Sequence, residues 1–265
     1  MKIGIFDSGL GGLIITHSLV ENLSEYDYLY YGDTARVPYG NRSQDIVYKF
    51  TKEAVEYLFK QDCNLIILAC NTASAEALRK IQGEYLPKNY PDRRVLGVII
   101  PTAEIVVEKT KSKKIGVIGT LSTINSGSFI REIKKLDSKV EVFQQATPLL
   151  VPLVENQGMN WIKPILEEYL EPLLRNNIDT LILGCTHYPA LKDLISKKAG
   201  SKIQIISQDE IIPNKLKDYL SRHPEIEKDL SKNSKREFLV TDLTENIQDL
   251  SKEFFGEKID LKLIK

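Results

Sequence analysis

The chain has 265 residues, of which 42% are hydrophobic and 27% charged, and its 36 basic residues balance 36 acidic ones. A net charge of zero gives no electrostatic footprint for nucleic acid or an anionic membrane surface, so we expect neither as a partner. No apolar run approaches the length of about 18 residues that predicts a membrane span, and no basic segment followed by an apolar one suggests export. Three cysteines do not make a disulfide framework. We therefore expect a cytoplasmic protein with free thiols.

Short apolar segments alternate with longer amphipathic ones along the chain. The strands predicted from this pattern cover residues 2–6, 28–31, 65–69, 95–99, 114–118, 140–144, 180–183 and 202–206. Segments with helical periodicity, such as 43–60 and 161–175, lie between most of them. Continuously apolar strands separated by helices are typical of parallel sheets that are covered on both faces. The sequence therefore predicts the α/β class.

Two pairs of segments indicate an internal repeat. KIGIFDSG from Lys2 resembles KIGVIGTL from Lys114, and NLIILACNTA with Cys70 resembles DTLILGCTHY with Cys185. The repeat predicts two pseudo-symmetric α/β domains with mainly parallel sheets and an active site in the cleft between them. We expect the first domain to comprise residues 1–97 and 208–265, whose last segment packs back onto it with a strand near 238–241. The second domain would then be 98–207.

A glycine-rich turn follows the first predicted strand. Ligands of open α/β sheets bind beyond the carboxyl ends of the strands, and this end carries Asp7, Ser8 and the glycines of residues 9–12. The pattern begins like a dinucleotide fingerprint, but its third glycine would fall at Ile14, and Asp7 would face a pyrophosphate. We therefore do not favour a nicotinamide or flavin. A tight strand-to-helix turn that needs backbone room explains the glycines better.

Cys70 and Cys185 occupy matching places in the repeat, each at the end of an apolar strand and the start of a predicted helix. Amides at a helix N-terminus stabilise anions, so we expect thiol pKa values below the ordinary value of about 8.5. Cys63 has no polar cluster around it and is predicted to pack as a small hydrophobe. A metal site is a weaker alternative, because there is no CxxC pair.

Two equivalent thiols that face each other across a cleft suit a particular chemistry. One can remove a proton from one face of a carbon while the other delivers a proton to the opposite face, which inverts a stereocentre. A Cys–His hydrolase would leave the second thiol unexplained. Each thiol needs a group that adjusts its protonation, and Asp7 could serve Cys70 while His187 serves Cys185.

Five motifs carry a resemblance to a known family. They are IGIFDSGLGG (3–12), YGDTARVPYG (31–40), ACNTAS (69–74), VPLVE (151–155) and LGCTHYP (183–189). With them the chain closely resembles the glutamate racemases, over essentially its whole length. The resemblance implies a cofactor-independent interconversion of L- and D-glutamate that supplies D-glutamate for bacterial peptidoglycan. It also implies no metal and a homodimer.

The resemblance also implies roles for individual residues. Cys70 and Cys185 would be the two catalytic bases, assisted by Asp7, His187 and Glu155. The residues that would hold the substrate are Ser8, Tyr39, Gly40, Asn71, Thr72, Thr123 and Thr186. The match is looser in the C-terminal third, where Gln208 lies in a segment in which glycine is common.

Two alternative functions stay open at this stage. One is a racemase for aspartate or another acidic amino acid, because one methylene changes binding by only about 1–3 kcal/mol. The other is a non-catalytic amino-acid-binding protein, although such a protein has no use for two symmetric bases.

Overall fold

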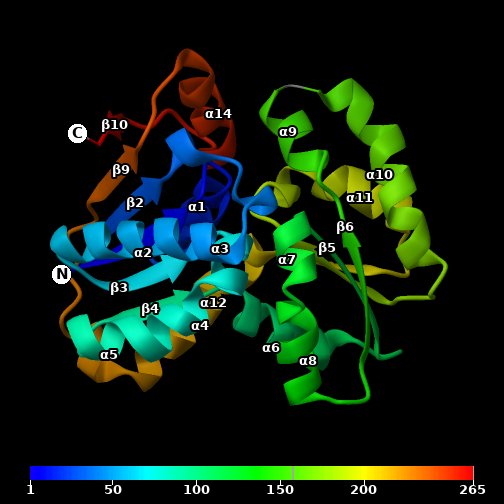
Figure 1. Ribbon diagram of the computed structural model, residues 1–265, viewed down its shortest axis with the longest axis horizontal. Helices are drawn as coiled ribbons and strands as arrows, with labels where there is room; N and C mark the ends of the chain where they lie inside the picture. Colours follow the sequence, from blue (N-terminus) through cyan, green and yellow to red (C-terminus); the bar gives the residue numbers. More distant parts are fainter. Residues whose placement is uncertain (157, 265) are drawn as a thin grey trace.

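The protein contains two parallel β-sheets (Figure 1). The computed structural model describes residues 1–156 and 158–264. The first sheet has the strand order β10-β9-β2-β1-β3-β4, with β1 Lys2–Asp7, β2 Tyr28–Gly32, β3 Cys63–Leu68, β4 Arg94–Gly97, β9 Arg236–Val240 and β10 Leu261–Leu263. The second has the order β6-β5-β7-β8, with β5 Lys114–Gly119, β6 Glu141–Ala146, β7 Thr180–Gly184 and β8 Gln204–Ile206.

The two sheets share one arrangement, since β2-β1-β3-β4 and β6-β5-β7-β8 follow the same pattern. Their registers agree as well, because β1 lies between β2 and β3 as β5 lies between β6 and β7. The chain passes to the second sheet through α6 (Ile99–Lys109) and returns through α12 (Gln208–Arg222). It then adds β9 beside β2 in the first sheet.

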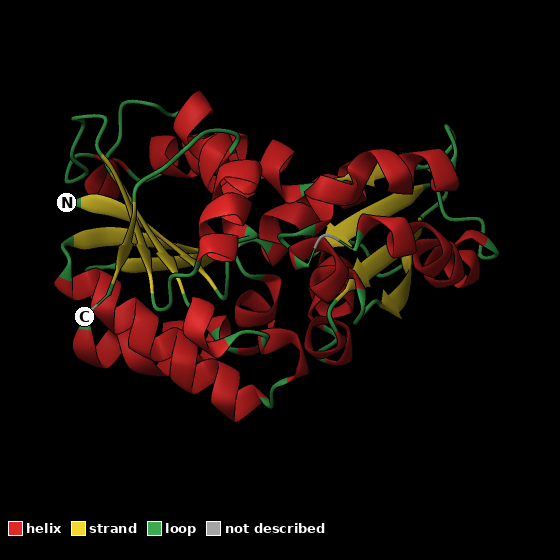
Figure 2. Ribbon diagram, turned by 90° about the horizontal axis from the view of Figure 1, so that it is seen from above, coloured by secondary structure: helices red, strands yellow, loops and turns green. Residues whose placement is uncertain are grey.

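Helices cover both faces of the sheets (Figure 2). Alternate side chains of β1 enter different apolar clusters: Ile3 and Ile5 join one, and Phe6 joins the other. Burial on both faces is the reason why the strands are continuously apolar. The remaining helices are α1 Gly12–Asn22, α2 Gln44–Lys60, α3 Asn71–Glu76, α4 Leu78–Lys80, α5 Leu86–Asn89, α7 Leu121–Asn125, α8 Ser128–Leu136, α9 Leu150–Glu155, α10 Met159–Leu174, α11 Lys192–Ala199, α13 Pro224–Glu227 and α14 Glu245–Phe255.

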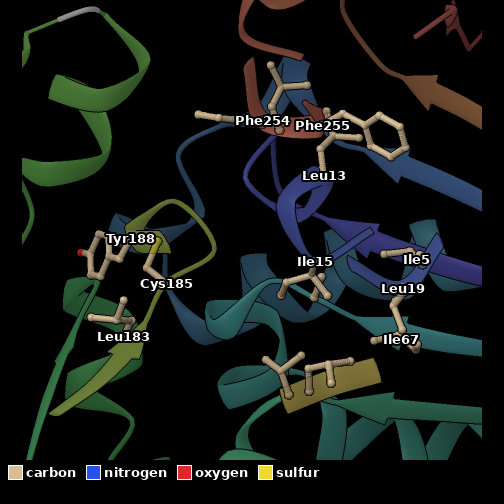
Figure 3. Close-up of a cluster of buried hydrophobic side chains, with 14 of the residues drawn as sticks. Ile5, Leu13, Ile15, Leu19, Ile67, Leu183, Cys185, Tyr188, Phe254 and Phe255 are labelled. Atoms are coloured by element: carbon tan, nitrogen blue, oxygen red, sulfur yellow. The ribbon is translucent and has the colours of Figure 1, made fainter. Parts of the chain in front are cut away.

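One apolar cluster continues from the first sheet to the second. It includes Ile5 and Leu13 on one side and Leu183 and Tyr188 on the other (Figure 3). Phe254 of α14 belongs to the same cluster. The carboxyl ends of β1 and β7 are therefore held close together by shared packing.

The predicted α/β class is confirmed, and the differences are local. The predicted strand at 95–99 ends at Gly97, because Ile99 already begins α6. The predicted strand at 140–144 runs from Glu141 to Ala146, and β10 had no counterpart in the prediction. In the ranges 1–156 and 158–264, no helix is long and apolar enough to cross a membrane.

Candidate active site

A cavity of about 70 Å³ lies where the carboxyl ends of both sheets converge. Ten of the twelve residues singled out from the sequence line it, namely Ser8, Tyr39, Gly40, Cys70, Asn71, Thr72, Glu155, Cys185, Thr186 and His187. The other two, Asp7 and Thr123, lie one contact away: Asp7 accepts a hydrogen bond from Thr186 and Thr123 contacts Thr72. The folding of the chain thus brings both cysteines to one cavity.

Cys70 lies between β3 and α3, where it caps the helix. Its Sγ accepts a hydrogen bond from the Ala73 backbone N–H at 3.5 Å, and its thiol donates to Ser8 Oγ at 3.2 Å. Burial raises the pKa of the Cys70 thiol to about 12, and the negative charge of Asp7 acts in the same direction. The expectation of a lowered pKa is therefore wrong for Cys70, because the loss of hydration outweighs one helix N-terminus and one hydroxyl.

Cys185 follows β7 and contacts His187, with 3.8 Å between Sγ and Nδ1. The other ring nitrogen, Nε2, lies 2.9 Å from Glu155 Oε1. Burial alone would lower the pKa of His187, but the interactions with Cys185 and Glu155 outweigh it and raise this pKa to about 10. This raised pKa favours the protonated ring, and Nδ1 faces the sulfur of Cys185.

Asp7 is fully buried at the end of β1. Its carboxylate accepts hydrogen bonds from the Gly9 backbone N–H at 3.0 Å and from the Thr186 hydroxyl at 3.3 Å. Burial raises the pKa of Asp7, opposed by the nearby charge of His187. The side chain of Asp7 thus contacts Thr186, a residue that follows the second sheet. The side chain that is hydrogen-bonded to the Cys70 thiol is that of Ser8, the residue after Asp7.

Two hydroxyls of the cavity wall form a triangle with a third hydroxyl behind them. Thr72 Oγ1 lies 3.0 Å from Thr120 Oγ1 and 3.3 Å from Thr123 Oγ1, and the last two are 3.0 Å apart. Thr72 is the second residue of α3 on the first-sheet side, whereas Thr120 and Thr123 follow β5. The triangle provides rotatable donors for a carboxylate. Among the described residues, no lysine or arginine lines this cavity.

The Tyr39–Gly40 wall is fixed by a buried carboxylate. Tyr39 donates its hydroxyl proton to Asp33 at 2.5 Å, and Asp33 also pairs with Arg36 and accepts from Thr241. A Cβ on Gly40 would lie 2.7 Å from Thr120 Cβ. The tyrosine hydroxyl is therefore occupied by Asp33, and the glycine allows the close approach of the second-sheet side.

Close approach also explains the glycine-rich turn. A Cβ on Gly11 would lie 2.6 Å from both His187 Nδ1 and Thr186 Oγ1, and one on Gly12 would lie 2.5 Å from Asp7 Cβ. The turn is thus filled by the protein's own side chains, in agreement with the sequence argument against a dinucleotide. No group of three or more histidine, cysteine, aspartate or glutamate side chains in the described part of the chain could hold a metal ion.

Sequence reasoning missed several residues of the cavity wall. Thr120 caps α7 at the end of β5, the place in the second sheet that corresponds to Ser8 in the repeat, but it is not among the twelve residues singled out. Thr147 follows β6 in the same way and is buried. The apolar part of the wall, formed by Val37, Pro38, Pro148, Val151 and Pro152, carries no polar signal.

Fold and cavity together define a two-sheet α/β enzyme with a pair of thiols at one site. Residues 3–211 match the Asp/Glu/Hydantoin racemase family model. The glutamate racemase of Sulfurihydrogenibium sp. is 41% identical over 271 residues, which cover 98% of each chain. The chain belongs to the Asp/Glu/Hydantoin racemase family, which confirms the expectation of an amino-acid racemase, an isomerase.

Solved structures agree with this assignment. Glutamate racemase isoform RacE1 from Bacillus anthracis has a TM-score of 0.91 and 34% identity, covering 100% of this chain and 97% of that one. Glutamate racemase from Francisella tularensis, solved in complex with D-glutamate, has a TM-score of 0.89 and 32% identity, with the same coverage. The similarity thus extends over both sheets.

Proposed function

We propose that the protein is a cofactor-independent glutamate racemase, which interconverts L- and D-glutamate and supplies D-glutamate for peptidoglycan. The observation that carries this proposal is that Cys70 and Cys185, at matching strand ends of two similar sheets, line the same cavity. We assign glutamate as the substrate because the chain is 41% and 34% identical to two glutamate racemases. Rotatable hydroxyls and amides at the cavity suit a dicarboxylate amino acid.

In the proposed reaction each thiol acts on one face of the α-carbon. Cys185, beside the His187 imidazolium, takes the α-proton of L-glutamate as a thiolate, and the protonated Cys70 delivers a proton to the opposite face. The pKa of about 12 keeps Cys70 protonated in this direction. D-glutamate requires the reverse protonation of the pair, with Cys70 as the base.

The surrounding residues support this exchange. Glu155 holds the His187 ring at 2.9 Å, and Asp7 acts electrostatically on both sides of the site. We propose that the substrate is held by Ser8, Tyr39, Gly40, Asn71, Thr72, Thr123 and Thr186. Preorganised donors around the cavity stabilise the negative charge that develops when the α-proton leaves.

The proposal includes the organisation of the chain. Residues 1–97 with 208–265 would form one domain and 98–207 the other, in keeping with the two sheets, and the active site would lie in the cleft between them. We also propose a homodimer, which sedimentation equilibrium would test. A cytoplasmic location suits a reaction that needs two reduced thiols, and all three cysteines are free.

Circular dichroism of the protein with D-glutamate in D₂O, without added cofactor, tests the function. We expect the optical signal to decay while deuterium enters at Cα. Replacing either Cys70 or Cys185 by serine should lower the rate by at least about 100-fold, the smallest usual contribution of a general acid or base, while Cys63→Ser should racemise normally. Racemisation that survives at the wild-type rate in either active-site variant would refute the two-thiol mechanism. Faster turnover of D-aspartate would change the assigned substrate.

A further inference from the structure

Gln208 forms an unusual contact behind the cavity. It is the first residue of α12, and it is buried with 2% exposure. Its side-chain amide pairs reciprocally with that of Asn71: Asn71 Nδ2 donates to Gln208 Oε1 at 2.7 Å, and Gln208 Nε2 donates to Asn71 Oδ1 at 2.8 Å. Asn71 lines the cavity next to Cys70, whereas Gln208 does not line it. The two hydrogen bonds to Asn71 thus connect Gln208 directly to a residue of the cavity wall.

A reciprocal pair of amides has no direction of its own. If both amides turned over together, each oxygen would replace a nitrogen and the two hydrogen bonds would form again. In this pair Asn71 keeps one N–H of Nδ2 and one lone pair of Oδ1 free for other partners. Turning the amide over would exchange the positions of this free donor and this free acceptor. The pair alone therefore holds Asn71 in place without deciding whether a donor or an acceptor faces the cavity.

Thr102 removes this ambiguity. Its hydroxyl donates to the Val98 carbonyl oxygen at 2.6 Å, so its Oγ1 can only accept from a third group. Gln208 Nε2 lies 3.4 Å from this Oγ1 and donates to it. The opposite orientation of Gln208 would place two oxygens together with no proton between them. Thr102 thus fixes Gln208, and Gln208 in turn fixes Asn71.

The hydrogen bond between Gln208 and Thr102 links the two helices through which the chain passes between the sheets. Thr102 lies on α6, which leads to the second sheet, and Gln208 begins α12, which returns from it. We propose that Gln208 is a positioning residue that, oriented by Thr102, fixes which end of the Asn71 amide faces the substrate. The inference rests on the proposed function, because it takes the ligand of the cavity to be glutamate.

Two pairs of variants test the inference. Gln208→Leu keeps the approximate side-chain size and frees the Asn71 amide; we expect the KM for D-glutamate to rise about tenfold, the effect of one oriented hydrogen bond, with a smaller change in kcat. The matched control is Gln144→Leu, because within the described residues the side chain of Gln144 makes one hydrogen bond, to the Ile124 carbonyl oxygen, and lies outside the cavity lining. We expect it to keep the wild-type KM.

The second pair isolates the orientation from the contact. Thr102→Val keeps the shape but loses the hydroxyl, so both orientations of the amide pair become populated, and a half-populated competent form raises the apparent KM about twofold. Thr102→Ser keeps the hydroxyl and should restore the wild-type KM. This pair decides the question if Gln208→Leu does not fold.

The outcomes separate this inference from the proposed function. The wild-type protein is assayed first, and an inactive wild type refutes the proposed function. In that case the variants are compared by their dissociation constants for D-glutamate, measured by calorimetry, in place of KM. A folded Gln208→Leu variant with wild-type KM, or a Thr102→Ser variant as impaired as Thr102→Val, overturns the positioning role. A fall in melting temperature without a change in KM would show a purely structural contact and would overturn it as well.

Discussion

Gly11→Ala tests how closely the two sides of the active site must approach. The backbone of Gly11 has φ −57° and ψ −30°, which alanine adopts without strain, so the substitution acts only through its added carbon. This Cβ would lie 2.6 Å from His187 Nδ1, whereas ordinary contact begins at 3.4 Å. The His187 loop would have to retreat by about 0.8 Å, the difference between these two distances.

His187 cannot yield freely, because Glu155 holds its other nitrogen at 2.9 Å and Cys185 lies 3.8 Å away. Overpacking of this kind costs about 1–3 kcal/mol of unfolding free energy. A displacement near 1 Å in a reacting geometry costs about 100-fold in rate. We therefore expect kcat for both enantiomers to fall about 100-fold in Gly11→Ala, with a melting temperature lower by roughly 2–4 °C per kcal/mol.

Racemisation followed by circular dichroism, together with thermal unfolding, measures both effects. Gly83→Ala is the matched control, because a Cβ there meets no atom of the described residues within 4 Å and Gly83 lies in a helical segment. It should keep the wild-type kcat and gain up to about 1 kcal/mol of stability. A folded Gly11→Ala protein with wild-type kcat/KM in both directions would show that the turn does not set the position of His187.

Three further substitutions address the charges of the site and of the fold. Glu155→Gln removes a carboxylate that helps to raise the pKa of His187 to about 10, so the alkaline limb of kcat/KM should move to lower pH; an unchanged limb contradicts this role. The pKa of His187 in the folded protein lies above the ordinary value of 6.5, so its contribution to the free energy of unfolding is complete below pH 6.5 and is lost as the pH rises through about 10. Urea unfolding at several pH values would detect this loss. Tyr39→Phe removes the 2.5 Å hydrogen bond to the buried Asp33 carboxylate and should cost about 2 kcal/mol of unfolding free energy and raise KM; wild-type values for both would show that the bond is dispensable. Hydrogen bonds outweigh the effect of burial and lower the pKa of Asp27 from 3.8 to about 2, so Asp27→Asn should be less stable than the wild type at pH 7 but converge with it as the pH falls to about 2; a constant difference would contradict the shift.

Much of the site could be predicted from the sequence because parallel α/β folds place chemistry at strand ends. Cys70 and Cys185 were identified from apolar runs that stop at a polar residue, and such runs are local signals. Thr120 was missed although it follows its strand in the same way, because a threonine that caps a helix has no distinctive chemistry of its own. Pro148, in the apolar part of the wall, lies in none of the five motifs and carries no polar group.

The pKa of Cys70 shows where local reasoning fails. The position at a helix start predicts a lowered pKa, but burial and the charge of Asp7 raise it to about 12. Both causes depend on what the rest of the chain places around the sulfur. Ser8, 62 residues away in the chain, supplies the hydroxyl in contact with the thiol.

The sequence by itself determined the α/β class, the strand ends that carry polar residues and the matching places of Cys70 and Cys185 in the repeat. These features follow from periodicity and repetition within short segments. Only the tertiary structure decided which of these ends share a cavity, that Asp7 reaches Thr186 on the other side, and that Gln208 meets Asn71 across 137 residues of chain. Contacts between distant segments depend on how the two sheets pack against each other. That packing is set by the whole apolar core, and no single segment encodes it.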